Sequence, residues 1–253
     1  MKLNYKEIGE GKPLIILHGL FGSFNNWISI GKSLAATRKV YLIDQRNHGN
    51  SPHSDVFTYK AMAADLKEFT EDHAIAECDL IGHSLGGKTA MFFATEFPSL
   101  VHKLIVVDIG PKQYPVHHDT IIEGLKSIDL AKLKSRTDAD NVLAQYVPLA
   151  SIRQFLLKNL KRTPEGFEWK INLDIIEKEI TEVGKALPSN AIFNKPTLFI
   201  RGGMSNYVLE DDVELINSHF PLCKLSTIKG ASHWVHAEKT TEFLHEVTQF
   251  LND

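Results

Sequence analysis

The stretch Cys78–Lys88 constrains the fold of this chain more than any other. It reads as a short apolar strand, then Gly-His-Ser-Leu-Gly at Gly82–Gly86, and then a helix expected to run to about Phe97 and stop at Pro98. A G-x-S-x-G segment between a strand and a helix is typical of a tight turn that exposes a serine hydroxyl, and its glycines let the two elements approach closely. Ser84 is therefore the candidate nucleophile. The alternative is that Gly82–Gly86 is only a turn that joins the strand to the helix, without a catalytic role.

Composition narrows the classes of function. The length of 253 residues is enough for one large α/β domain with an insertion. The net charge of −3, without a long run of one sign, does not favour nucleic acid or an anionic membrane as a partner. Neither a signal-peptide core nor an apolar run of membrane-spanning length is present, which predicts a cytoplasmic protein. Cys78 and Cys223 lack metal or disulfide spacing and are expected as buried or half-buried thiols.

Short apolar runs alternate with amphipathic helices up to Val107. Four of the runs look like strands buried on both faces, as in a mostly parallel sheet: Leu14–Leu17, Val40–Ile43, Leu80–Ile81 and Leu104–Val107. Two more follow at Pro196–Ile200 and Lys224–Ile228, before a helix at Thr240–Leu251. Leu3–Ile8 is predicted to pair as an antiparallel hairpin with the first buried run.

The pattern changes between residues 112 and 192. Short helical segments replace the buried-strand runs there and are broken at Pro148 and Pro164. We therefore expect a helical cap at 112–192, inserted into an α/β core made of residues 1–111 and 193–253. A cap in this place would lie over the carboxyl ends of the strands and would set substrate specificity.

An activated serine needs a base, and twelve histidines compete for that role. His233 follows the last predicted strand, in the chain order serine, acid, histidine, and is our candidate, with His236 as its rival. His18 and His83 are expected to shape the floor of the site. The remaining histidines that we considered are expected at the solvated surface: His117, His118, His219 and His245.

The oxyanion of the reaction needs two N–H donors. Leu85 follows Ser84 at the start of a helix, where backbone N–H groups are free. Leu17–Gly22 follows the first buried strand and should supply the second N–H, from Leu20 or, as second choice, from Phe21. A simple strand-to-helix turn is the plain alternative for that segment.

Four segments together resemble the α/β-hydrolase superfamily: Gly82–Gly87, His18–Gly19, Asp44–Ser51 and Gly230–His233. The resemblance covers the chain apart from the insertion. It implies an eight-stranded, mostly parallel sheet flanked by helices, with a helical cap inserted after the sixth strand. Within Asp44–Ser51 we expect the side chains to hold their own loop together rather than to contact substrate.

The base also needs an acid that holds it in place. The position of this acid in the chain departs from the usual pattern of this superfamily. Most members place it after the seventh strand, where this chain has Ser205, and a neutral hydroxyl cannot stabilise an imidazolium. Asp108 instead ends the sixth strand, at the sheet edge beside the nucleophile, from which a carboxylate could reach the histidine loop. Asp108 could also cap the turn before Pro111. Glu210, Asp211 and Asp212 are further alternatives, although they are expected to open the next helix.

An acid after the sixth strand, with Arg201–Tyr207 after the seventh, resembles the small bacterial YbfF-type acyl esterases and their mitochondrial relatives. The resemblance implies a serine carboxylesterase that hydrolyses esters or thioesters of small to medium acyl groups through an acyl-enzyme, without cofactor or metal. Phe21, Trp169 and Trp234 are expected in an apolar substrate pocket. A lyase or a cofactor-free haloperoxidase on the same fold is the alternative, and a non-catalytic ligand-binding protein the remote one.

Overall fold

The computed structural model describes residues 1–116 and 118–253. Within these residues a seven-stranded sheet has the order β1-β3-β2-β4-β5-β8-β9, and every neighbouring pair is parallel except β1 and β3. The family resemblance had implied eight strands, one more than this sheet has among the described residues. The seven strands are β1 (Tyr5–Ile8), β2 (Lys12–Leu17), β3 (Arg38–Ile43), β4 (Cys78–His83), β5 (Val101–Val107), β8 (Thr197–Gly202) and β9 (Cys223–Ile228).

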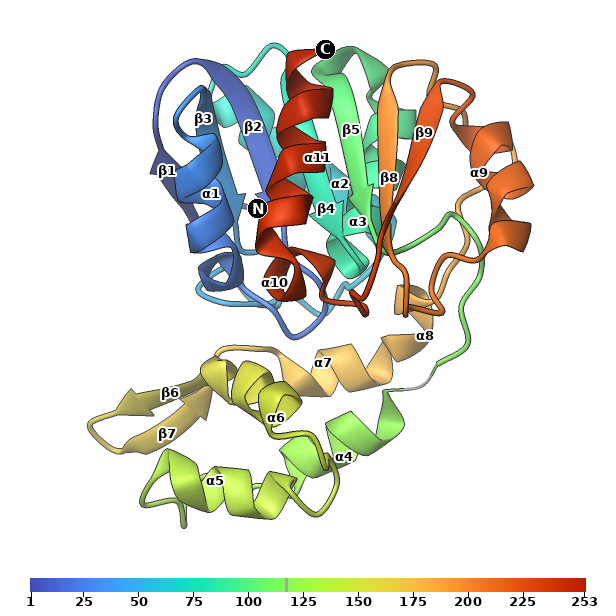
Figure 1. Cartoon of the computed structure of the whole chain (residues 1–253). Coiled ribbons are helices and arrows are strands. Elements are labelled where there is room, and N and C mark those ends of the chain that lie inside the picture. Colours follow the sequence, from blue (N-terminus) through green and yellow to red (C-terminus); the bar gives the residue numbers. More distant parts are fainter. Residues whose placement is uncertain (117) are drawn as a thin grey trace.

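Helices cover both faces of the sheet (Figure 1). One face carries α1 (Ile28–Leu34) and α11 (Thr240–Asn252), and the other carries α2 (Tyr59–Asp72) and α3 (Leu85–Glu96). Shorter elements complete the core: α9 (Val213–His219), α10 (Val235–Glu238) and the 3-10 turns η1 (Phe24–Trp27), η2 (Pro98–Leu100) and η4 (Glu210–Asp212). Within the part of the chain that the structure describes, no helix combines the length and apolar character that a membrane crossing requires.

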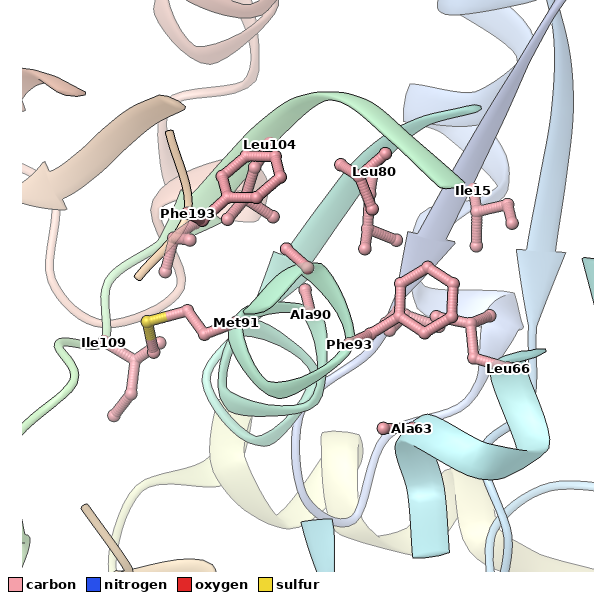
Figure 2. Close-up of a cluster of buried hydrophobic side chains, with 14 of the residues drawn as sticks. Ile15, Ala63, Leu66, Leu80, Ala90, Met91, Phe93, Leu104, Ile109 and Phe193 are labelled. Carbon is pink, nitrogen blue, oxygen red and sulfur yellow. The ribbon is translucent and has the colours of Figure 1, made fainter. Parts of the chain in front are cut away.

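Alternation along the buried strands builds two separate cores. In β2, Ile15 and Leu17 pack on the side of α2 and α3, whereas Leu14 and Ile16 pack on the side of α1 and α11. Figure 2 shows part of the first core, in which strand side chains meet those of α2 and α3. Because both faces are covered, these strands are continuous apolar runs, which is the pattern that the sequence showed.

The partner of β1 differs from the prediction. β1 pairs antiparallel with β3, with Tyr5 opposite Ile43 and Ile8 opposite Val40, and it does not form a hairpin with β2. Both edges of β2 are already occupied by the parallel strands β3 and β4. The free edge of β3 is therefore the place where β1 can complete its hydrogen bonds.

Within the insertion expected at 112–192, residues 119–183 form a layer beyond the carboxyl ends of the parallel strands (Figure 1), whereas Tyr114 and Leu187 pack into the core on the side of α2 and α3. An all-helical insertion was expected, but β6 and β7 form a two-stranded hairpin within it. These strands have four residues each and mostly exposed or half-buried side chains, so they leave no buried apolar run in the sequence. The elements are α4 (Asp119–Lys126), α5 (Arg136–Leu143), α6 (Ala150–Leu156), η3 (Leu157–Asn159), β6 (Leu160–Thr163), β7 (Gly166–Trp169), α7 (Leu173–Lys178) and α8 (Ile180–Val183).

Lys88 ties this layer to the sheet. Its side chain is fully buried on α3, and its Nζ donates to the carbonyl oxygens of Lys112 at 2.5 Å and Lys185 at 2.7 Å. These carbonyls lie where the chain leaves and re-enters the core, and the N–H of Leu187 donates to the carbonyl oxygen of Pro111 at 2.8 Å between the same two segments. One buried lysine thus holds both connections of the inserted layer.

Replacing Lys88 tests this connection. Lys88→Met keeps a long side chain but leaves two buried carbonyl groups without their donor, which we expect to lower the free energy of unfolding by about 1–3 kcal/mol. Urea unfolding followed by circular dichroism measures the change. Lys60→Met, at an exposed position of α2, is the matched control and should change stability little. Equal midpoints for the two variants would contradict the role of Lys88.

Candidate active site

Ser84 occupies the turn between β4 and α3. Its backbone has φ 53° and ψ −118°, a conformation that residues other than glycine rarely adopt. A Cβ added at Gly82 would lie 2.2 Å from the carbonyl oxygen of Gly86, and one added at Gly86 would lie 2.5 Å from that of Leu17. The N–H of Ser84 donates to the carbonyl oxygen of Val107 at 3.1 Å, which fastens the turn to β5. Both glycines are therefore required by close backbone contact.

The buried carboxylate of Asp108 faces the histidine loop. Its Oδ2 accepts from Nδ1 of His233 at 2.8 Å and from the hydroxyl of Ser205, and its Oδ1 accepts from the N–H of Gly202 at 2.8 Å. Three donors thus satisfy a charge whose burial would otherwise be costly. The side chain is directed at these donors rather than at the turn before Pro111.

His233 lies in the loop between β9 and α10. Because its Nδ1–H donates to Asp108, its Nε2 is the nitrogen left to accept a proton. The ring stacks on Tyr207 with centroids 3.9 Å apart and planes at 18°, and Nε2–H of His83 donates to the backbone carbonyl of His233 at 2.9 Å. These contacts hold the ring at the cavity that Ser84 also lines.

The rival histidine has a different environment. The ring of His236 is buried and stacks on Trp27, with centroids 4.1 Å apart and planes at 9°. Burial lowers the pKa of His236 to about 3, which makes it a poor proton acceptor at neutral pH. Its surroundings therefore favour His233 as the base.

The rival carboxylates lie in and around η4, as expected. Glu210 forms an ion pair with Arg201 at 2.8 Å, and Asp212 forms one with Lys112 at 2.6 Å. Asp211 is exposed. The hydrogen bond to His233 belongs to Asp108 instead.

Two backbone N–H groups flank Ser84 without another acceptor. Among the described residues, the N–H groups of Leu20 and Leu85 make no hydrogen bond, whereas the N–H of Phe21 donates to Nε2 of His48 at 3.3 Å. Phe21 has a left-handed φ of 57°, and Nδ2 of Asn159 donates to its carbonyl oxygen at 2.7 Å. The loop geometry thus favours Leu20 over Phe21 as the donor.

Neutral imidazoles brace this loop. Nδ1–H of His18 donates to the carbonyl oxygen of Gly19 at 2.8 Å, while its Nε2 accepts from the N–H of Gln45 at 3.0 Å. Nδ1–H of His48 donates to the carbonyl oxygen of Arg46 at 2.9 Å. Burial lowers the pKa of His18 to about 4 and that of His48 to about 3. Both rings are therefore uncharged at neutral pH and act as fixed hydrogen-bonding groups.

The loop Asp44–Ser51 is held together by its own side chains, as expected. The Asp44 carboxylate accepts from the N–H groups of Phe24 at 2.7 Å and Asn50 at 2.9 Å, and from Nδ2 of Asn4 at 2.7 Å. The hydroxyl of Ser51 donates to the carbonyl oxygen of Asp44 at 2.5 Å. The loop thereby fixes the end of β3 next to the Leu17–Gly22 segment.

A cavity of about 350 Å³ opens beside Ser84. Phe21 and Trp234 line it as expected, but Trp169 does not. Trp169 pairs with Leu160 in the β6–β7 hairpin and packs against the hydrophobic cluster of the inserted layer. The expectation for Trp169 was wrong because the direction of its side chain depends on a hairpin that the sequence pattern did not reveal.

Several site residues were missed from the sequence. Ile152 and Phe155 of α6 line the cavity, and no local pattern distinguished them from ordinary core residues of a helix. Ser205 had been noted as the residue in the usual place of the acid, and Tyr207 lies two residues beyond it. The segment after β8 was thus the signal that could have placed both residues beside Asp108.

The histidines that were expected at the solvated surface lie in different environments. His219 was expected at the surface but is buried, and its Nδ1–H donates to the carbonyl oxygen of Ala191 at 2.7 Å. His118 is half-buried and lines the cavity, whereas His245 is exposed as expected. His117 lies outside the described residues. Burial of an imidazole in this way requires a carbonyl partner from another segment, which a local pattern does not show.

Comparisons with known proteins give the family to which this chain and its fold are similar. A family model described as the alpha/beta hydrolase fold matches residues 12–125. The chain is 40% identical over 251 residues to the sn-1-specific diacylglycerol lipase ABHD11 of Danio rerio, covering 96% of this chain and 79% of that protein. It is 33% identical over 247 residues to esterase YbfF of Escherichia coli, covering 96% and 94%. A solved marine microorganism esterase has a TM-score of 0.96 at 44% identity, covering 98% and 99%.

The buried imidazoles predict how stability depends on pH. The folded-state pKa values of His18, His48 and His236 lie below the unfolded value of about 6.5, so only the unfolded chain takes up these protons as the pH falls from about 6.5 towards 4. Their contribution to stability is complete above pH 6.5 and is lost below it, by about 1.4 kcal/mol per pH unit for each ring. Urea unfolding between pH 8 and pH 5 measures the slope.

His236→Phe provides the specific test, because a phenyl ring can still stack on Trp27 but cannot bind a proton. Between pH 6.5 and pH 5, the free energy of unfolding of the variant should therefore fall less steeply with decreasing pH, by the contribution of one ring. At pH 8 that contribution is constant, so the difference in free energy of unfolding between the variant and the unmodified protein at this pH gives the effect of altered packing alone. An unchanged slope would show that His236 does not titrate on unfolding.

Proposed function

Since this chain belongs to the α/β-hydrolase family, we propose that Ser84, His233 and Asp108 hydrolyse carboxylic esters through an acyl-enzyme. The activity is of the esterase or lipase type, as in the relatives that the chain matches along most of its length. The observation that carries the assignment of roles is the 2.8 Å hydrogen bond from His233 to the buried Asp108, at the cavity that contains Ser84.

The first step forms the acyl-enzyme. Oγ of Ser84 attacks the acyl carbon while its proton passes to Nε2 of His233, and the carbonyl π electrons move onto the oxygen. The N–H groups of Leu20 and Leu85 stabilise that oxyanion. When the intermediate collapses, the bond to the alcohol oxygen breaks, and His233 returns the proton to this leaving oxygen.

Water completes the cycle. It attacks the acyl carbon of the acyl-enzyme while His233 takes one of its protons, and the same proton then passes to the departing Oγ of Ser84. Asp108 holds the ring in the required tautomer and stabilises the imidazolium that forms in each half-reaction. Serine, histidine, ester and water carry every proton and electron pair, so the proposed reaction needs no cofactor.

The inserted layer serves as the cap of this site in the proposal, over a core made of residues 1–111 and 193–253. Ile121 of α4 and Ile152 and Phe155 of α6 line the cavity that Ser84 also lines, so residues 112–192 would set which esters fit. A cytoplasmic location is also part of the proposal. Its support is that Cys78 and Cys223 are free thiols, which is usual in a reducing compartment.

Ser84→Ala tests the nucleophile. We expect turnover of p-nitrophenyl acetate to fall by a factor on the order of 10⁶, because the acyl-enzyme can no longer form. Ser33→Ala, at an exposed position of α1, is the matched control and should keep full activity. Mass spectrometry after a fluorophosphonate should find one adduct in the control and none in Ser84→Ala. Near-normal turnover by purified, folded Ser84→Ala would exclude the acyl-enzyme on this residue.

The position of the acid can also be tested. Asp108→Asn should lower kcat by roughly 10⁴, because His233 loses its counter-charge and its correct tautomer. The hydroxyl of Ser205 already contacts the same carboxylate oxygen as His233. The double variant Asp108→Asn with Ser205→Asp returns a carboxylate to within reach of the ring, so it should recover part of the loss. Full activity of Asp108→Asn alone would place the acid elsewhere.

A further inference from the structure

Two cavities meet at Ser84. The larger, of about 350 Å³, is lined by His233 and Trp234. The smaller, of about 20 Å³, shares Ser84 and Leu20 with the larger and is also lined by Leu85 and Val183, which do not line the larger one. A cavity of the smaller volume holds about one water-sized or methyl-sized group. The two halves of an ester bound at Ser84 therefore meet very different amounts of space.

This inference rests on the proposed function. If that function is correct, the position of His233, which protonates the leaving alcohol, decides which half of the ester lies in which cavity. In the proposed reaction His233 gives a proton to the leaving alcohol oxygen, so that oxygen must lie near Nε2 of His233. Among the described residues, His233 lines the larger cavity and not the smaller one. The alcohol consequently occupies the larger cavity, and the acyl group is left with the smaller one beside Leu20 and Leu85.

Hydrogen bonds hold two of the side chains that line the smaller cavity. Lys88 lines this cavity, and its Nζ donates to the carbonyl oxygens of Lys112 and Lys185. The hydroxyl of Tyr59 donates to the carbonyl oxygen of Val183 at 2.6 Å. An alkyl chain longer than a methyl group would have to displace these side chains and break their hydrogen bonds to buried carbonyl groups, which is unfavourable.

The larger cavity has room to continue. A groove of about 330 Å³ shares Asn26, Ile152, Phe155, Trp234 and His236 with it. Besides Ala237, its other lining residues are polar or charged, namely Asn25, Ser151, Lys158 and Glu238. An alcohol leaving Ser84 along this path therefore meets the apolar side chains of Ile152, Phe155 and Trp234 first and mostly polar residues afterwards.

We propose that the enzyme is selective for acetate esters of larger, mainly apolar alcohols, with the acetyl methyl in the small cavity and the alcohol in the large cavity and its groove. The selectivity comes from the volume beside Leu20, Leu85 and Val183 and from the position of His233. The enzyme should therefore accept alcohols of many lengths but only a short acyl group.

An isomeric pair of esters tests the proposal with the intact protein. Hexyl acetate and ethyl hexanoate have the same formula and differ only in which side of the ester carries the long chain. We expect kcat/KM for hexyl acetate to be greater by roughly tenfold or more, the scale on which an apolar pocket discriminates by size. Equal values, or a preference for ethyl hexanoate, would overturn the assignment of the two cavities.

A cavity variant tests the same assignment independently. Val183→Ala enlarges the small cavity while keeping the carbonyl that binds Tyr59, so the ratio of butyrate to acetate turnover should rise severalfold. Val142→Ala, on α5 and away from both cavities, is the matched control and should leave the ratio unchanged. An unchanged ratio in active Val183→Ala would also overturn the proposal.

The outcome is separable from that of the proposed function. Failure of the proposed function would show as turnover of p-nitrophenyl acetate that survives Ser84→Ala. If Ser84→Ala abolishes turnover of both isomeric esters while ethyl hexanoate is the better substrate of the unmodified protein, only the assignment of the cavities fails.

Discussion

The buried carboxylate of Asp108 is the interaction on which the site depends. A charge at 1% exposure is tolerated only if donors surround it, and its three donors come from two segments, the end of β8 with the loop after it and the loop after β9. Gly202 ends β8, Ser205 follows it, and His233 follows β9. Satisfying this one group therefore draws the ends of three neighbouring strands together and gives His233 its orientation and tautomer.

Local backbone geometry places the site residues at the carboxyl edge of the sheet. Ser84, Asp108 and Phe21 all have positive φ values, and each follows a parallel strand at the same edge of the sheet. Such conformations persist only where the surrounding structure fixes them, here through close glycine contacts and the neutral, hydrogen-bonded rings of His18 and His48. The sheet thus supplies a rigid frame, and the inserted layer determines the space left around it.

Much of the fold and of the site could be predicted because the signals are local. Apolar runs marked strands covered on both faces, and the glycines around Ser84 marked a turn that tolerates no added Cβ. The chain order of serine, acid and histidine pointed to His233 after the last strand, and a single carboxylate at the end of β5 pointed to Asp108. Each inference relied on a few consecutive residues and on the rule that parallel strands end at a common edge.

Tertiary structure alone decided the rest. It put β1 on the free edge of β3, placed Trp169 outside the cavity, buried His219 against a distant carbonyl and brought Ser205 against Asp108 and Tyr207 against His233. Local sequence patterns report which face of an element is buried and where the backbone must bend tightly. The choice of a partner far along the chain depends instead on which sheet edges, volumes and hydrogen-bonding groups remain free after every element has packed, and that is a property of the whole fold.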